Sequence, residues 1–348
     1  MNGSFIVQPD ETVLITGATG FIGPALIESL LQKGFRNLRA FVRPSSDFSR
    51  LEAVARSNAN TAYLDVVRGN LLSRDDCLRA TEGAAVVFHL ATSGDKSFPD
   101  AYLNSVVTTR NLIESSLQQR ALRRFVNVSS FAVYDNSQRG PLDETAPLEQ
   151  HPESCGDAYS FAKLMQEEVV ADYGKRFDFP FVNVRPGSVY GPGKRGITGR
   201  VGVDTFGIFL HLGGSNRIPF TYIENCADAI ALSGLIPGVD GETFNVVDDS
   251  LPSSRRFLRL YKRNVAAFRS IYIPSSLSYG LCWLWERYSS WSHGQLPPAF
   301  NRRRWRVEWK STRYSNAKIK ARLGWKPRVA TDEGLKRYFS ASRGTQDA

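Results

Sequence analysis

The sequence has few cysteines and few histidines, and neither residue type is clustered. The four cysteines include no Cys-x-x-Cys pair, and the four histidines show no metal-ligand spacing. They are Cys77, Cys155, Cys226, Cys282, His89, His151, His211 and His293. Cysteines this far apart predict reduced thiols in a cytoplasmic chain rather than a disulfide framework. Histidines this scattered give no reason to predict a metal site.

Long apolar runs are also missing. No uninterrupted run reaches the roughly 18 residues that span a bilayer. The nearest candidate, Ile271–Trp285, is interrupted by Pro274 and three serines. The first residues, MNGSFIVQPDETVLITG, show no basic segment followed by an apolar one, which argues against a secretory signal peptide. We therefore expect a cytoplasmic protein that is at most peripheral to a membrane.

Acidic residues are scarce in the last part of the chain, where basic residues are abundant. The net charge is +10, but residues 254–348 contain 21 Lys and Arg against 5 Asp and Glu. A nucleic-acid binder usually carries its basic face in its main domain, so we predict no nucleic-acid partner. Apolar residues make up 42% of the 348 positions, which excludes a wholly disordered chain. This length predicts two domains, or one large domain with an added lobe.

The first 190 residues alternate short β-branched runs with helical periodicity. Strands are predicted at residues 12–16, 39–42, 62–67, 85–90, 124–128 and 181–184, and helices at 24–33, 100–119 and 159–173. Such alternation predicts an α/β protein with a Rossmann-type, doubly wound parallel sheet. We predict a dinucleotide-binding Rossmann domain over residues 1–185. Residues 186–348 would form mainly a smaller substrate-binding lobe, with some segments returning to the first domain.

The second half of the chain has a different composition. Residues 186–199 are rich in glycine and proline, which predicts loops at the carboxyl edge of the sheet. Residues 270–310 are dense in aromatics and arginine, and no sheet pattern is evident there.

A glycine-rich turn follows the first predicted strand. The run Gly17-Ala18-Thr19-Gly20-Phe21-Ile22-Gly23 separates that strand from a helix. Gly17 permits a tight turn, Gly20 lets backbone N–H groups approach a pyrophosphate, and Gly23 allows close helix–strand packing. Thr19, Phe21 and Ile22 would also contact the dinucleotide. The alternative is a tight turn that binds no ligand.

The end of the second strand distinguishes NAD from NADP. An acidic residue there binds the ribose 2′-hydroxyl of NAD, whereas a basic one accommodates the 2′-phosphate of NADP. The sequence has Arg43 followed by Pro44 and two serines, with no acid before Asp47. NADP is therefore the preferred cofactor and NAD the alternative, unless Arg43 is solvated or stacks on the adenine that both cofactors share.

Further motifs follow in a fixed order along the chain. They are Gly69-Asn70-Leu71, His89-Leu90-Ala91, VSSFAVY at 128–134, Tyr159-Ser160-Phe161-Ala162-Lys163, RPGSVYGPG at 185–193 and LGWKP at 323–327. Together with the glycine turn they resemble the extended short-chain dehydrogenase/reductase superfamily, with its NAD-dependent epimerase/dehydratase family, over nearly the whole chain. The resemblance implies that Asn70 and Leu71 meet the adenine. It also implies that Leu90, Ala91 and Thr92 line the cofactor channel, and that Pro186 and Ser188 lie near the nicotinamide.

Tyr159 and Lys163 are the predicted catalytic pair. Two other Tyr-x-x-x-Lys spacings exist, but Tyr190/Lys194 spans Gly-Pro-Gly and Tyr314/Lys318 lies in the basic tail. Only Tyr159 and Lys163 share a predicted helix within the βα region, where a spacing of four puts them on one face. A nearby ammonium favours the phenolate, so we expect Lys163 to lower the pKa of Tyr159 and also to reach the nicotinamide ribose.

Other catalytic positions follow from the resemblance alone. It implies that Ser130 binds the substrate oxygen, with Ser129 as the fallback. It also implies that Asn104 holds a relay water for the lysine, although an ordinary exposed helix residue is the alternative. Tyr134 is interpreted as a packing residue.

Two reaction classes compete within the superfamily. One is oxidoreduction of a secondary alcohol or ketone, as in 3β-hydroxysteroid dehydrogenase-like enzymes, and the other is nucleotide-sugar epimerisation or dehydration. The epimerases carry an asparagine shortly after the sixth strand, where this chain has Pro186-Gly187-Ser188, and an arginine that clamps the diphosphate. Arg217 falls one position too early for that clamp. We therefore favour the first class, with an apolar alcohol or ketone as substrate. A nucleotide sugar, or a non-catalytic NADP sensor, is the alternative.

The aromatic and basic segment at 271–309 allows several interpretations. It would form an apolar substrate pocket, a face for an anionic membrane, a diphosphate site, or a packed helical lobe with a solvated basic edge. The partners considered are thus a small-molecule substrate, an anionic membrane surface and a second copy of the chain in a homodimer.

Overall fold

The computed structural model describes residues 5–57, 63–92, 94, 97–151, 157–194, 196–205, 207–292 and 300–343. Ala62, at the start of a predicted strand, and Cys155 and His293 lie outside these ranges. Within them, seven parallel strands form one sheet in the order β11-β6-β5-β4-β1-β2-β3. The strands are β1 (Thr12–Thr16), β2 (Asn37–Val42), β3 (Tyr63–Arg68), β4 (Ala84–His89), β5 (Arg124–Val128), β6 (Phe181–Pro186) and β11 (Thr243–Val246). The predicted α/β class and Rossmann-type sheet are confirmed.

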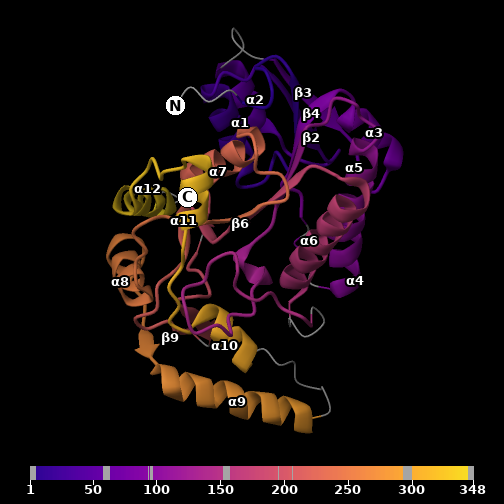
Figure 1. Cartoon of the computed structure of the whole chain (residues 1–348). Helices are drawn as coiled ribbons and strands as arrows, with labels where there is room; N and C mark the ends of the chain where they lie inside the picture. The colour runs from indigo at the N-terminus through magenta and orange to yellow at the C-terminus, as the bar shows by residue number, and fades with distance from the viewer. Residues whose placement is uncertain are drawn as a thin grey trace.

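Helices cover both faces of the sheet, which is why its central strands are apolar along their whole length. Every residue of β4 and β5 is buried. Helices α1 (Gly23–Gln32) and α7 (Ile223–Leu235) pack together on one face, and α3 (Arg74–Thr81), α5 (Thr108–Ser116) and α6 (Ala158–Phe177) cover the other (Figure 1). Strand β11 and helix α11 (Ala317–Leu323), both from the second half of the chain, pack at the β6 edge of the sheet.

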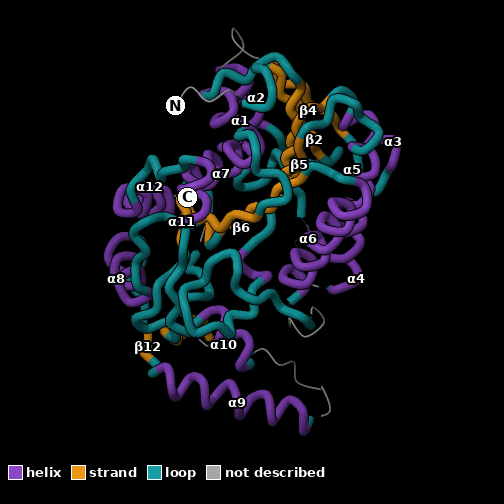
Figure 2. The backbone as a smooth tube through the Cα atoms, in the orientation of Figure 1, coloured by secondary structure: helices purple, strands orange, loops and turns teal. Residues whose placement is uncertain are grey.

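The rest of the second half builds a lobe with an apolar core of its own. Its strands are β7 (Ser188–Tyr190), β8 (Gly202–Thr205), β9 (Ile208–His211), β10 (Phe220–Tyr222) and β12 (Ser270–Tyr272). Helices α8 (Ser254–Asn264) and α12 (Thr331–Arg343) bury Phe257 and Tyr338 against Phe220 of β10. Much of the lobe is loop, and helices α9 (Ser275–Trp291) and α10 (Arg302–Glu308) lie at its far end (Figure 2).

The structure departs from the sequence prediction at several places. The helix predicted over 100–119 consists of α4 (Phe98–Ala101), a π-helical turn η1 (Tyr102–Val107) and α5. Strand β7 lies where the sequence predicts loop, and β12 lies where it shows no sheet pattern. Both strands have only three residues, which is too short for a periodic signal, and their partners β10 and β9 are remote in sequence.

Candidate active site

A cavity of about 1030 Å³ opens beside the carboxyl ends of β1, β4 and β5. The strand order reverses between β1 and β4, and ligands of open parallel sheets bind in the crevice at such a reversal. One side of the cavity comes from the glycine turn after β1, the ends of the strands and helix α6. The other side comes from the lobe.

At each of its three glycines, the turn leaves too little room for a Cβ atom. Gly17 has a φ of +67°, and a Cβ atom there would lie 2.8 Å from the backbone nitrogen of Ala91. A Cβ on Gly20 would lie 3.0 Å from the carbonyl oxygen of Gly17. At Gly23 it would lie 2.1 Å from the carbonyl oxygen of Ala18, at the start of α1. Gly23 thus serves close packing of the helix and does not line the cavity.

All the other predicted site residues line this cavity. They are Gly17, Thr19, Gly20, Phe21, Ile22, Arg43, Asn70, Leu71, Leu90, Ala91, Thr92, Asn104, Ser130, Tyr159, Lys163, Pro186 and Ser188. The fold therefore brings together residues from six separate motifs. Their individual contacts with a cofactor or substrate remain predictions.

The charge of the cavity suits a dinucleotide. Among the described residues that line it, the charged ones are Arg43, Lys163 and Lys194, and no carboxylate is present. The glycine turn adds a helix N-terminus, which favours an anion. A tight turn at a helix N-terminus and a lining without carboxylates among the described residues both fit a dinucleotide pyrophosphate. Arg43 is exposed where β2 has ended, the position predicted for the 2′-phosphate.

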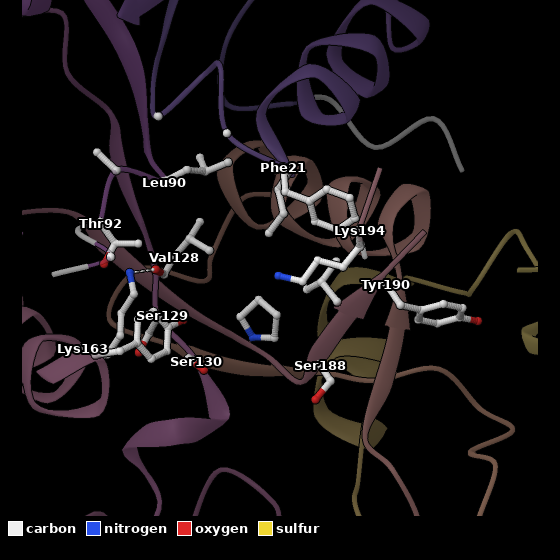
Figure 3. Close-up of a pocket in the computed structure, with 18 of the residues that line it drawn as sticks. Phe21, Leu90, Thr92, Val128, Ser129, Ser130, Lys163, Ser188, Tyr190 and Lys194 are labelled. Carbon is white, nitrogen blue, oxygen red and sulfur yellow. Dashed lines mark hydrogen bonds between the residues drawn. The ribbon is translucent and has the colours of Figure 1, made fainter. Parts of the chain in front are cut away.

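The predicted catalytic pair lies at the start of α6. Asp157 caps this helix, since its side chain accepts a hydrogen bond from the Ser160 backbone nitrogen at 2.8 Å. Tyr159 is therefore in the first turn and Lys163 one turn later. Lys163 is buried, and its Nζ donates to the carbonyl oxygen of Val128 at 2.7 Å (Figure 3).

The two pKa shifts differ from the sequence prediction. Desolvation raises the pKa of the Tyr159 phenol, and a hydrogen bond from Ser130 partly offsets this rise. Burial also lowers the pKa of Lys163 to about 7, against the opposing effect of Glu167. The expectation that Lys163 depresses the phenol pKa is therefore corrected for the free protein, because the ammonium is itself partly neutralised and is bonded to Val128.

Ser130 and Ser129 both reach the cavity, but their partners differ. Ser130 hydrogen-bonds Tyr159, and its hydroxyl also accepts from the Ala132 backbone nitrogen at 3.2 Å. The Ser129 hydroxyl is buried and has no hydrogen-bond partner within the described part of the chain. The geometry thus favours Ser130 as the partner of Tyr159 and leaves Ser129 available to a ligand.

Asn104 and Tyr134 have contrasting environments. Asn104 is exposed on the π-helical turn η1, on the cavity wall, and such turns are frequent at functional sites. Tyr134 is fully buried, and its hydroxyl donates to Asn245 Oδ1 and accepts from Arg185, at 2.8 and 2.9 Å. Tyr134 is therefore a packing residue, as interpreted from the sequence.

Lys194 is a cavity residue that the sequence analysis did not select. It follows the Gly191-Pro192-Gly193 turn, and Figure 3 shows its side chain extending into the cavity past Phe21. Its Nζ lies 5.6 Å from the centre of the Phe21 ring. The only available signal was a cation directly after the RPGSVYGPG motif.

Two sequence candidates lie outside the cavity. Arg217 donates to the carbonyl oxygen of Leu251 at 2.7 Å and lines a second, smaller cavity with Arg256 and Asp332. No described residue of the aromatic and basic segment 271–309 lines the main cavity. The described residues of that segment therefore do not form the substrate pocket, because α9 and α10 pack at the far end of the lobe.

No group of metal-ligating side chains occurs in the described ranges. The described part of the chain also contains no helix with the length and apolarity needed to cross a bilayer.

Comparisons with known proteins agree with this architecture. The chain is 28% identical to sterol-4-alpha-carboxylate 3-dehydrogenase, decarboxylating, of Saccharomyces cerevisiae, over 95% of this chain and 97% of that protein. It is 25% identical to 3beta-hydroxysteroid-dehydrogenase/decarboxylase isoform 1 of Arabidopsis thaliana, over 97% and 80% of the two chains. The structure of UDP-glucuronic acid 4-epimerase from Bacillus cereus, in complex with UDP-glucuronic acid and NAD, has a TM-score of 0.70 at 20% identity. That likeness covers 96% of this chain and 99% of the epimerase.

The family model described as NAD-dependent epimerase/dehydratase matches residues 13–246. This range contains the parallel sheet except for Thr12, the glycine turn and the Tyr159/Lys163 helix. The chain therefore belongs to the NAD-dependent epimerase/dehydratase family and is an NAD-dependent enzyme of the extended short-chain dehydrogenase type.

Proposed function

We propose that this enzyme oxidises a secondary alcohol, or reduces the corresponding ketone, on a largely apolar substrate with NADP as its preferred cofactor. The observation that carries the proposal is the lining of the lobe side of the cavity. Most of its residues are apolar or aromatic, namely Val189, Tyr190, Ile197, Phe220, Phe257 and Tyr338, and its polar members are Ser188, Lys194 and Thr198. A fused-ring alcohol would bury its surface there, whereas a sugar diphosphate would leave its hydroxyls and charges without partners.

The three catalytic side chains have separate tasks in this proposal. In reduction, Tyr159 donates its proton to the carbonyl oxygen, and the Ser130 hydroxyl hydrogen-bonds the same oxygen. The raised pKa keeps the phenol protonated at neutral pH, as an acid requires. The nicotinamide, when bound, supplies or accepts the hydride at the substrate carbon. Lys163 would orient the nicotinamide ribose.

Relatives and geometry support the alcohol over the nucleotide sugar. Two relatives that are matched over at least 80% of their own length are named as steroid or sterol dehydrogenases. Arg217, the residue nearest to the expected diphosphate clamp, bonds Leu251 outside the cavity. Nucleotide-sugar conversion is the second candidate, because Lys194 places one cation on the lobe side of the cavity and because solved epimerases share the fold.

A substrate panel separates the two candidates. The purified chain is incubated with NADP or NAD and with steroid alcohols, sterol 4-carboxylates, UDP-glucose or UDP-glucuronic acid, and absorbance at 340 nm is followed. We expect stoichiometric reduction of the dinucleotide with a sterol. Conversion of a UDP-sugar without net dinucleotide reduction would contradict the proposal.

The cofactor preference rests on Arg43. We expect NADP to bind at least tenfold more tightly than NAD, and Arg43→Asp to reverse the order, because one charge-assisted contact contributes roughly 1.5–3 kcal/mol. Isothermal titration calorimetry with both dinucleotides measures this. Arg36→Asp, an equal charge change at an exposed position outside the cavity, is the control. Tighter binding of NAD by the unmodified protein would refute the assignment.

Lys194 is assigned to an anionic group on the substrate. Lys194→Met should raise KM for a sterol carboxylate about tenfold or more, because it removes one charge-assisted contact. It should leave KM for the uncharged sterol, and the Kd of the dinucleotide, unchanged. Lys326→Met, at an exposed position outside the cavity, is the matched control. A weakened dinucleotide Kd with unchanged substrate KM would instead assign Lys194 to the cofactor.

A further inference from the structure

Helix α9 has the reverse of the burial expected for a helix on a globular protein. Its buried residues are small, namely Ser278, Cys282 and Ser289. Large apolar side chains on the same helix are exposed instead. An amphipathic helix normally turns its apolar face towards the core. The apolar side of α9 therefore lacks a partner within the described part of the chain.

Five of the exposed apolar residues of α9 form a stripe along the helix, whereas Tyr279 and Trp283 lie on another face. Leu277, Leu281, Leu284, Tyr288 and Trp291 recur with spacings of four, three, four and three, which places them on one face of the helix. They are between 46% and 75% exposed. We call these five residues the apolar stripe. Large contiguous apolar surface is rare on a monomer and marks a binding surface.

The helix is held firmly enough for the stripe to be a fixed feature. Trp305 of α10 donates from Nε1 to the Ser278 hydroxyl at 2.9 Å, and its ring packs edge-to-face on Tyr279. The Arg302 side chain of α10 bonds Glu286 at 2.6 Å. These contacts lie away from the apolar stripe. In Figure 1, α9 lies across the end of the molecule, beyond α10 and far from the sheet.

The surroundings of the stripe are cationic. Glu286 and Glu308, the carboxylates of α9 and α10, are each paired with an arginine, Arg302 and Arg304 respectively. Arg287 and Arg306 are exposed beside them. Helices α9 and α10 together carry five arginines and two glutamates, so the apolar stripe lies on a helix pair with net positive charge. A second copy of the chain would bring the same positive charge to the interface, whereas an anionic lipid surface would complement it.

We propose that the apolar stripe of α9 lies in the interfacial layer of an anionic membrane, with the flanking arginines on the lipid headgroups. Tyr288 and Trp291, at the end of the stripe, are residue types that favour that layer. A helix of 17 residues with exposed polar positions is suited to lie along a membrane rather than to span it. The proposal does not depend on the reaction assigned to the cavity.

Flotation of the full chain with lipid vesicles tests the proposal. Phosphatidylcholine vesicles are compared with vesicles that also contain phosphatidylserine, at low and at physiological salt. We expect at least tenfold stronger binding to the anionic vesicles, and a steep loss of binding as salt is added. Tryptophan emission should shift to shorter wavelength on binding. No binding to anionic vesicles at low salt would overturn the proposal, and so would equal binding to both vesicle types.

A matched pair of variants separates the contribution of the apolar stripe to vesicle binding from the effect of an added negative charge. Leu284→Glu adds one negative charge within the stripe, and Ser276→Glu adds the same charge at an exposed position on another face of α9. We expect Leu284→Glu to lose at least tenfold in vesicle binding and Ser276→Glu to stay within about threefold of the unmodified chain. Neither substitution removes a buried contact, and a thermal melt by circular dichroism verifies that both variants fold.

The same variants distinguish a lipid surface from a second copy of the chain. In analytical ultracentrifugation without lipid, we expect the unmodified chain and Leu284→Glu to show the same state of association. A dimer that dissociates in Leu284→Glu but not in Ser276→Glu would assign the stripe to a chain–chain interface and overturn the lipid assignment.

Discussion

Tyr159→Phe is expected to lower kcat by roughly 10²–10⁴, the usual contribution of a positioned acid or base. The substitution keeps the ring and removes only the hydroxyl that would exchange the proton. Tyr159 is 39% exposed because it lines the cavity, so the change should not disturb the core. Folding and the dinucleotide Kd should therefore remain unchanged. Steady-state kinetics with the substrate found in the panel, together with calorimetric titration of the dinucleotide, measure both effects.

The pH dependence gives a second readout for the same residue. The pKa of Tyr159 is raised, so the phenol is protonated at neutral pH and must lose its proton to act in oxidation. Oxidation by the unmodified enzyme should accelerate as pH rises, and Tyr159→Phe should lose this limb of the profile. Tyr314→Phe, outside the cavity, is the comparison variant. A variant Tyr159→Phe that kept most of its activity would show that the proton passes through another group.

Glu167→Ala is expected to lower the free energy of unfolding by about 3–5 kcal/mol. Glu167 holds the buried Arg185 through two hydrogen bonds of 2.5 and 2.9 Å, and both side chains are 6% exposed. Removal of the carboxylate leaves a buried guanidinium with only the Tyr134 hydroxyl as its described side-chain partner. Urea denaturation, monitored by circular dichroism, measures the loss.

The neighbouring residue provides the control. Glu168 lies on the exposed face of the same helix, and Glu168→Ala should change stability by no more than about 0.5 kcal/mol. Glu167 also opposes the lowering of the Lys163 pKa, so Glu167→Ala should leave the lysine more neutral and weaken turnover in the folded fraction. Equal stability of the two variants would show that the Arg185–Glu167 pair contributes no net stability.

Local patterns in the sequence were sufficient for the fold class and most of the cavity. The strand TVLIT at 12–16 and the glycine turn are contiguous, so their geometry depends on neighbours in the chain. The same holds for Tyr159 and Lys163, whose spacing on one helix requires no tertiary information. The family's recurring motifs follow successive strands of a parallel sheet. Because the carboxyl ends of these strands share one edge, the sequence was enough to predict that the motifs meet there.

Only the tertiary structure decided the properties that depend on distant neighbours. The opposing pKa shifts of Tyr159 and Lys163 arise from burial by several elements, which a pattern of letters does not encode. Lys194 became a cavity residue because the lobe folds back over the sheet, and Arg217 was excluded because it bonds Leu251.

The aromatic helix α9 shows the same division between sequence and structure. Its composition predicted an apolar face. Composition does not indicate whether that face packs against the protein or is exposed to solvent. The sequence by itself determined the first six strands of the sheet, the glycine turn and the placement of Tyr159 and Lys163 on one helix, because these depend on short-range spacing. The tertiary structure decided which charges are buried, which cations reach the cavity and which helix face meets solvent, because each depends on contacts between residues far apart in the chain.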